Sequence, residues 1–155
     1  MLATEKLDGI TGRGACSIAG VQARAIHHVG IAVEDLDEAV ETYERFFGGR
    51  LEGRGEIAGQ QVEAASVVLD SGRVELVAAL HDESTVARFI ARRGPGMHHI
   101  AYEVEDVQTA LEGLVREGAR LIDEEPHQGL FGLQVAFVHP ESVHGVLTEV
   151  VSTGG

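Results

Sequence analysis

A chain of 155 residues in which 44% are hydrophobic is long enough to bury the core of one domain. Its 25 acidic and 12 basic residues give a formal net charge of -13, which disfavours a nucleic-acid surface. No stretch reaches the roughly 18 apolar residues of a membrane span, no signal-peptide core is present, and Cys16 is the only cysteine. We therefore expect a soluble cytoplasmic protein that binds neither nucleic acid nor a membrane.

The first 24 residues differ from the rest of the chain. They show no sustained hydrophobic period and include four glycines, which predicts a flexible leader over residues 1–24. Residues 25–155 are then expected to form a single domain.

This domain begins with a strand and a helix. Residues 26–33 read as a strand, and residues 35–47 place apolar side chains at spacings of three and four, as a helix that packs on a core does. Gly48 and Gly49 follow and offer the end of the helix.

The same pattern returns 71 residues later. "AIHHVGIAVEDL" at residues 25–36 and "GMHHIAYEVEDV" at residues 96–107 both contain two histidines, a short apolar strand and an acidic helix start. A strand over residues 97–104 and a helical stripe over 107–115, with Gly118 as its stop, complete the match. The chain is therefore expected to consist of two related modules.

Three further strand-like runs follow the helix in each half. They are "RLEGRG", "QVEAASVVLD" and "RVELVAAL" in the first half and "ARLIDE", "LQVAFVHP" and "GVLTEVV" in the second. Between the halves, residues 82–94 predict a linker helix with Ser84 as its N-cap. We expect an α+β fold with two tandem βαβββ modules, about 25–80 and 96–151, whose strands form one curved, barrel-like mixed sheet.

Strand parity separates the two histidines of each pair. Successive strand side chains point to opposite faces, so His27 shares the bulky apolar face that should pack under the helix. His28 lies on the other face with Gly30 and Ala32, whose side chains are too small to fill a core. By the same count His99 faces this hollow in the second half, and the histidine before it lies on the packed side.

Carboxylates recur in the last strand of each half. Glu75 in "VEL" and Glu149 in "TEV" stand at matching positions and point away from their apolar neighbours. With His28 and His99 they form two repeat-related pairs of an imidazole and a carboxylate, which suit a divalent first-row metal. A strand histidine or glutamate is by itself more often structural. The joint recurrence favours a metal site enclosed between the modules.

These residues also resemble a known family. The repeat with ligands in its first and last strands is similar to the vicinal oxygen chelate superfamily, and "ESTVARFIARRGPGMHHIA" and "FVHPESVHGVLTE" resemble the methylmalonyl-CoA epimerase family within it. The likeness runs from about residue 26 to residue 151. It implies an isomerase that acts on an acyl-CoA substrate, interconverts (R)- and (S)-methylmalonyl-CoA, and forms a homodimer.

The resemblance also implies the site. It places the metal ligands at His28, Glu75, His99 and Glu149. The second of these is Gln in some members, so Glu75 adds a negative charge that they lack. The implied cofactor is a divalent ion, with Co²⁺ favoured and Mn²⁺, Ni²⁺ or Zn²⁺ as alternatives.

Two catalytic residues follow from the resemblance, Glu63 as the base and Glu149 as a second acid/base group. Aligning "QVEAASVV" with "QVAFVHPE" places Ala136 at the position of Glu63. The carboxylate is therefore present in only one module, as expected of a residue that acts on one side of the substrate. A solvated strand glutamate is the alternative. The expected chemistry removes the C2 proton through an enolate and returns one on the opposite face, with a cation stabilising the negative charge.

Other readings remain open. A glyoxalase I-type lactoylglutathione lyase uses the same ligand set and differs by turning over methylglyoxal with glutathione. A metal-free binding or resistance protein of this fold would lack the four ligands. Ring-cleaving dioxygenation is disfavoured, because it generally needs two histidines and one carboxylate. Arg92 and Arg93, at the end of the linker helix, either meet coenzyme A phosphates or complement the helix dipole.

Overall fold

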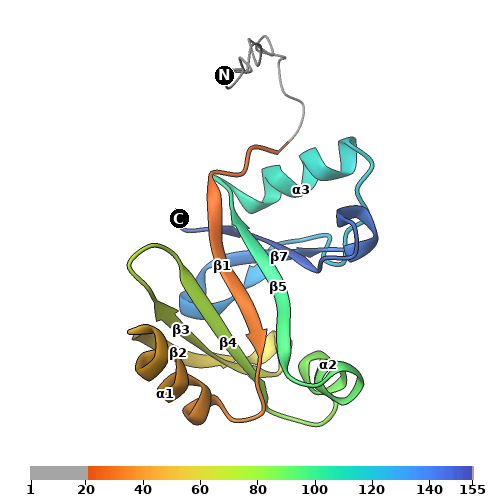
Figure 1. Ribbon diagram of the computed structural model, residues 1–155. Coiled ribbons are helices and arrows are strands. Elements are labelled where there is room, and N and C mark those ends of the chain that lie inside the picture. The colour runs from red at the N-terminus through yellow and green to blue at the C-terminus, as the bar shows by residue number, and fades with distance from the viewer. Residues whose placement is uncertain (1–20, 155) are drawn as a thin grey trace, which may run out of the picture.

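An eight-stranded mixed sheet organises the part of the chain that the structure describes. The computed structural model describes residues 21–154, with the strand order β2-β3-β4-β1-β5-β8-β7-β6. β1 (Ala25–Ala32) is parallel to β4 (Arg73–Ala79) and antiparallel to β5 (Gly96–Glu103), and β5 is parallel to β8 (Thr148–Ser152). β1 and β5 therefore lie side by side at the centre (Figure 1).

The first module runs from β1 to β4. Between these strands lie α1 (Leu36–Phe47), β2 (Arg50–Ile57) and β3 (Val62–Val68). Asp35 caps α1 by accepting a backbone N–H bond of 3.0 Å within the first turn, and Gly48 ends the helix with a left-handed φ of 65°. The helix thus begins and ends where the sequence predicts.

The second module repeats this order behind a linker helix. α2 (Thr85–Arg93) connects β4 to β5, and Ser84 caps it by accepting a 3.1 Å bond from a backbone N–H of its first turn. β5 leads to α3 (Val107–Arg116), β6 (His127–Gln128), β7 (Gln134–Val138) and β8. The expected fold of two βαβββ modules in one curved mixed sheet is confirmed.

One predicted strand does not form. The run "ARLIDE" contributes only a single bridge between Leu121 and Val138. The reason is that the backbone N–H groups of Ile122 and Asp123 both donate to Phe137 O, at 3.0 and 3.1 Å. The Asp123 carboxylate also accepts from Phe137 N at 2.8 Å, so the run crosses β7 instead of pairing along it. The short β6, which was not expected, pairs with β7 in its place.

Helices cover the outer face of each module. α1 packs on β3 and β4, and α3 packs on β7 and β8, at opposite ends of the molecule (Figure 1). The cluster beneath α1 contains Leu36, Val40, Ala65, Val67, Leu76 and Ala78, and the cluster beneath α3 contains Val104, Val107, Ala110, Leu111, Ala136 and Val150.

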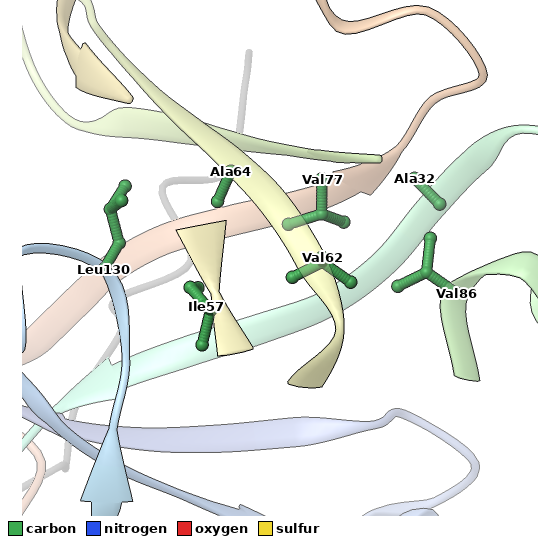
Figure 2. Close-up of a cluster of buried hydrophobic side chains, with 7 residues drawn as sticks. All are labelled: Ala32, Ile57, Val62, Ala64, Val77, Val86 and Leu130. Carbon is green, nitrogen blue, oxygen red and sulfur yellow. The ribbon is translucent and has the colours of Figure 1, made fainter. Parts of the chain in front are cut away.

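The other face of the first module has its own core, closed by α2 and by the second module. Figure 2 shows Val86 of α2 and Leu130, which follows β6, against four side chains from β1, β3 and β4 and one from the end of β2. The cluster consists of Ala32, Ile57, Val62, Ala64, Val77, Val86 and Leu130. Leu130 of the second module therefore completes the core of the first.

The start of the described chain is attached to the second module. Val21 packs against the cluster beneath α3, and Arg24 N donates to Glu103 O at 2.8 Å. The remainder of the expected leader, residues 1–20, lies outside the described residues. Within residues 21–154, every helix is too short or too polar to cross a membrane.

Replacement of Leu111 by Ala is expected to lower the free energy of unfolding by about 2–5 kcal/mol, because it leaves a cavity beneath α3. Leu111 is 2% exposed, whereas Val115 on the same helix is 56% exposed. Val115→Ala is therefore the matched control, with an expected loss below about 1 kcal/mol. Urea unfolding of both variants measures the difference, and equal losses would contradict the assigned core.

Candidate metal centre

The two histidines predicted as ligands meet across the central strand pair. His28 Nε2 lies 3.0 Å from His99 Nε2, and each residue is 3% exposed. The contact depends on Gly30, which is paired with His99 in the register of β1 and β5. A Cβ atom at Gly30 would overlap the His99 ring, so the imidazole crosses β1 only because no side chain stands there.

Two carboxylates close the group from the neighbouring strands. Glu75 Oε2 lies 3.6 Å from His28 Nε2, and Glu149 Oε1 lies 3.5 Å from the same nitrogen. The parallel pairing of β4 with β1 and of β8 with β5 sets both carboxylates on the face that carries the histidines. His28, His99 and Glu149 offer ligand atoms that all lie within 4.8 Å of one another. The structure thus brings together the four side chains that the sequence predicts.

Burial drives all four groups toward their neutral forms. It lowers the pKa of His28 to about 3 and holds the pKa of His99 well below its usual value. It raises the pKa of Glu75 to about 7, and burial together with the nearby Glu75 raises the pKa of Glu149 well above its usual value. The imidazoles are therefore held neutral, and the carboxylates lack a positive partner.

The donor set fits a divalent cation. Neutral imidazole nitrogens and carboxylate oxygens are the ligands that first-row divalent ions prefer, and a cation would reverse the effect of burial on both carboxyl groups. A small cavity of about 10 Å³ is lined in part by His28, Glu75 and Glu149. Such a space holds about one water-sized particle. The arrangement can therefore hold one ion that draws on both modules.

The histidine that precedes each candidate ligand in the sequence is hydrogen-bonded to it. His27 Nδ1 lies 2.8 Å from His28 Nδ1, and His98 Nδ1 lies 2.9 Å from His99 Nδ1. Such partners orient the ring of a ligand and set its tautomer. Arg73 in turn donates to His27 Nε2 at 2.9 Å. Parity had placed the first histidine of each pair against the helix side, and the doubled histidines were the signal for this supporting role.

The shift in strand register explains why parity misled at these positions. The pairing of β1 with β5 is irregular between Ile26 and His28, so His27 does not follow the simple alternation of the strand. In the second module His98 packs edge-on against Phe89 of α2, with ring centroids 4.9 Å apart, and lines a large cavity.

Glu63, predicted to be the catalytic base, lies outside the group. Its Oε1 is 2.8 Å from Nη2 of Arg54, which also pairs with a carboxylate of α1. Its neighbours Val62 and Ala64 belong to the core cluster on the inner face, so Glu63 points to the α1 face. The repeat-related Ala136 lies beneath α3 in the same way. Strand parity turns the side chain away from His28, so the structure does not bring Glu63 together with the four candidate ligands.

A large cavity opens beside His99. It has a volume of about 1010 Å³ and extends from β5 and α2 to the segment around β6 and β7. Its polar walls include Asp123 and His127, which are joined by a 2.9 Å hydrogen bond, and its apolar walls include Phe137. A space of this size admits a substrate far larger than the group that the four candidate ligands would contact.

Replacement of Gly30 by Ala is expected to weaken divalent metal binding by roughly 10–100-fold, because the new Cβ displaces the His99 ring. Gly55→Ala on β2 is the control, since a Cβ there meets only Leu130 Cδ1 at 3.7 Å. Isothermal titration of both purified variants with Co²⁺ measures the affinity. An unchanged affinity in Gly30→Ala would show that the ring is not held by this clearance.

In the metal-free protein, Glu75→Gln is expected to increase stability at pH 8 and not at pH 4.5. The pKa of Glu75 is about 7 in the folded protein, above its usual 4.5, so the folded state binds the proton more tightly. The free energy of unfolding therefore falls as the pH rises from about 4.5 through about 7, and the neutral amide avoids this loss.

The gain at pH 8 should reach about 3 kcal/mol at most. Urea unfolding of wild type and Glu75→Gln in a chelator, at both pH values, measures the effect of removing this charge, including its repulsion of Glu149. A difference that does not change with pH would contradict the assigned burial of its charge.

Known proteins share both the sequence pattern and the fold. Residues 27–137 match the Glyoxalase/Bleomycin resistance protein/Dioxygenase superfamily. The mitochondrial methylmalonyl-CoA epimerase of Dictyostelium discoideum is 33% identical over 126 residues, which cover 81% of this chain and 76% of the relative. The ethylmalonyl-CoA/methylmalonyl-CoA epimerase of Cereibacter sphaeroides is 34% identical over 127 residues, covering 81% of this chain and 95% of the relative.

A solved structure agrees with these relatives. The crystal structure of methylmalonyl-CoA epimerase from Mycobacterium tuberculosis superimposes with a TM-score of 0.83 at 32% identity, covering 86% of this chain and 90% of that one. The chain therefore belongs to the glyoxalase/bleomycin resistance protein/dioxygenase superfamily and, within it, to the methylmalonyl-CoA epimerase family.

Proposed function

We propose that this protein is a methylmalonyl-CoA epimerase, which inverts C2 of methylmalonyl-CoA by removing one proton and returning another on the opposite face. The observation that carries the proposal is the buried group of His28, His99, Glu75 and Glu149 between the two modules, in a chain whose relatives bear that activity in their names. The large cavity beside His99 supports a bulky thioester substrate.

The chemistry needs two kinds of group. The C2–H group is only weakly acidic, and removal of its proton leaves negative charge that spreads onto the thioester oxygen. A bound divalent ion supplies a Lewis acid for that charge. His28 and His99, which burial keeps neutral, and the carboxylates of Glu75 and Glu149 would hold it.

Proton transfer falls to the two buried carboxyl groups. In the strand order β4-β1-β5-β8, Glu75 and Glu149 flank the central histidines from opposite sides, which suits transfer to and from opposite faces of a planar enolate. We assign Glu149 as one acid/base group and Glu75 as the second, in place of Glu63.

The cofactor, assembly and location are part of the same proposal. The mixed nitrogen and oxygen donors suit Co²⁺, with Mn²⁺, Ni²⁺ and Zn²⁺ as alternatives. We further propose that the protein forms a homodimer and is located in the cytoplasm. Metal analysis of protein purified without chelator tests the first part, and light scattering after size-exclusion chromatography tests the second.

Proton NMR of methylmalonyl-CoA in deuterated water is the decisive measurement. The metal-loaded protein is expected to exchange the C2 proton for deuterium, and chelation is expected to abolish this exchange. Glu149→Gln should lower the exchange rate by at least about 100-fold, because a neutral amide neither accepts nor returns a proton. Glu63→Gln should retain most of the wild-type rate, since its side chain pairs with Arg54 on the α1 face.

Each outcome separates two interpretations. A strong loss of exchange in Glu63→Gln as well as in Glu149→Gln would restore the pair of catalytic residues, Glu63 and Glu149, that the sequence predicts. No exchange by metal-loaded wild type would overturn the epimerase proposal. Methylglyoxal with glutathione is the parallel substrate, and its turnover without C2 exchange would identify a glyoxalase I-type lyase instead.

A further inference from the structure

Three of the 12 basic residues of the chain lie along one short helix. Arg88, Arg92 and Arg93 belong to α2 and line the cavity of about 1010 Å³. Arg92 and Arg93 complement the dipole at the end of the helix. Arg88, however, stands four residues before Arg92, and like charges at this spacing destabilise a helix by a few tenths of a kcal/mol. Helix stability therefore does not explain the whole group.

These arginines are free of carboxylate partners within the described part of the chain. The ion pairs among residues 21–154 use Arg24, Arg54, Arg73 and Arg120, and none uses an arginine of α2. All three arginines of α2 are exposed. In a chain with a net charge of -13, they form an uncompensated positive rim that would attract a polyanion.

The cavity connects this rim to the candidate metal centre. His99 and the three arginines line the same cavity. Arg93 is oriented by the ring of Phe89, whose centroid lies 5.6 Å from the guanidinium carbon. The walls also include the apolar residues Val86, Phe89, Met97, Phe137, Val146 and Leu147. One space is therefore lined by a candidate metal ligand, by apolar side chains and by three arginines.

Acidic residues also line the cavity, and their positions matter. Asp123 is hydrogen-bonded to His127 at 2.9 Å and to Phe137 N at 2.8 Å, so its charge is already engaged. Glu83 precedes the N-terminus of α2, whereas Arg92 and Arg93 lie in its last turn. Neither carboxylate forms an ion pair with an arginine of α2 in the described part of the chain.

We propose that Arg88, Arg92 and Arg93 bind the phosphate groups of the acyl-CoA, while its thioester lies at the group formed by His28, His99, Glu75 and Glu149. This inference rests on the proposed function. Coenzyme A carries its phosphates at the far end of a pantetheine arm from the thioester, and guanidinium groups bind phosphate with paired hydrogen bonds. The rim recognises the coenzyme, and the buried group recognises the acyl part.

A substrate without phosphates tests the assignment. C2 deuterium exchange is measured for methylmalonyl-CoA and for methylmalonyl-pantetheine, with wild type and the triple variant Arg88→Gln/Arg92→Gln/Arg93→Gln at one ionic strength. The triple variant is expected to raise KM for the CoA ester by roughly tenfold or more, with kcat nearly unchanged. Both constants for the pantetheine ester should stay as in wild type.

A second triple variant controls for overall charge. Arg45, Arg50 and Arg116 are exposed arginines that do not line the cavity, so Arg45→Gln/Arg50→Gln/Arg116→Gln removes the same charge elsewhere. It should leave KM for the CoA ester within about twofold of wild type, apart from screened long-range effects. Arg88→Gln alone should raise the same KM by a smaller factor than the triple variant.

Direct binding of free coenzyme A gives an independent readout. Calorimetric titration should show a loss of affinity in the triple variant of α2 and not in the control, and a weaker dependence on KCl concentration. Equal KM values for the two triple variants would overturn this inference while leaving the epimerase proposal intact. Exchange of neither ester by metal-loaded wild type would instead overturn the proposed function.

Discussion

The clearance above Gly30 is the constraint on which the rest of the site depends. β1 and β5 are adjacent antiparallel strands, and the His99 ring reaches His28 only by passing over a backbone position without a side chain. Once the two imidazoles are in contact, the parallel pairing of β4 and β8 on either side brings a carboxylate to each flank. The order of strands in the sheet, and not any single loop, therefore sets the geometry of the candidate metal centre.

This geometry buries ionisable side chains in the middle of the protein without a compensating positive charge from residues 21–154. Four ionisable groups share a buried space, and burial pushes the pKa of each toward the value that leaves it uncharged. The hydrophobic clusters beneath α1 and α3 stabilise the fold against this cost. The donor set of this buried group suits a cation, and the chain belongs to the methylmalonyl-CoA epimerase family.

Strand parity and the internal repeat were enough to predict much of this from the sequence. Small residues on the same face of the strand predict His28 as a ligand, the same strand count in the repeat predicts His99, and matching positions in the repeat predict Glu75 and Glu149. Parity failed at His27, where the register of β1 shifts, and local bonds to Phe137 replaced the expected strand over "ARLIDE". Glu63 was assigned by resemblance against the parity of its own strand, and the alternation of β3 turned it toward Arg54. The large cavity draws on distant segments, which no local pattern reveals.

The position of Leu130 has a consequence for how the chain is made. This residue, 7% exposed, belongs to the inner core cluster of the first module although it follows β6 in the second. A nascent chain that has emerged only as far as β4 already contains Val62, Ala64 and Val77 but lacks Val86 and Leu130, which complete the cluster. At synthesis rates of about 5–20 residues per second, several seconds pass between the translation of β4 and that of Leu130, during which this apolar surface is not fully covered. The two halves repeat each other in sequence, yet the inner core cluster of the first is complete only after Leu130 of the second has been translated.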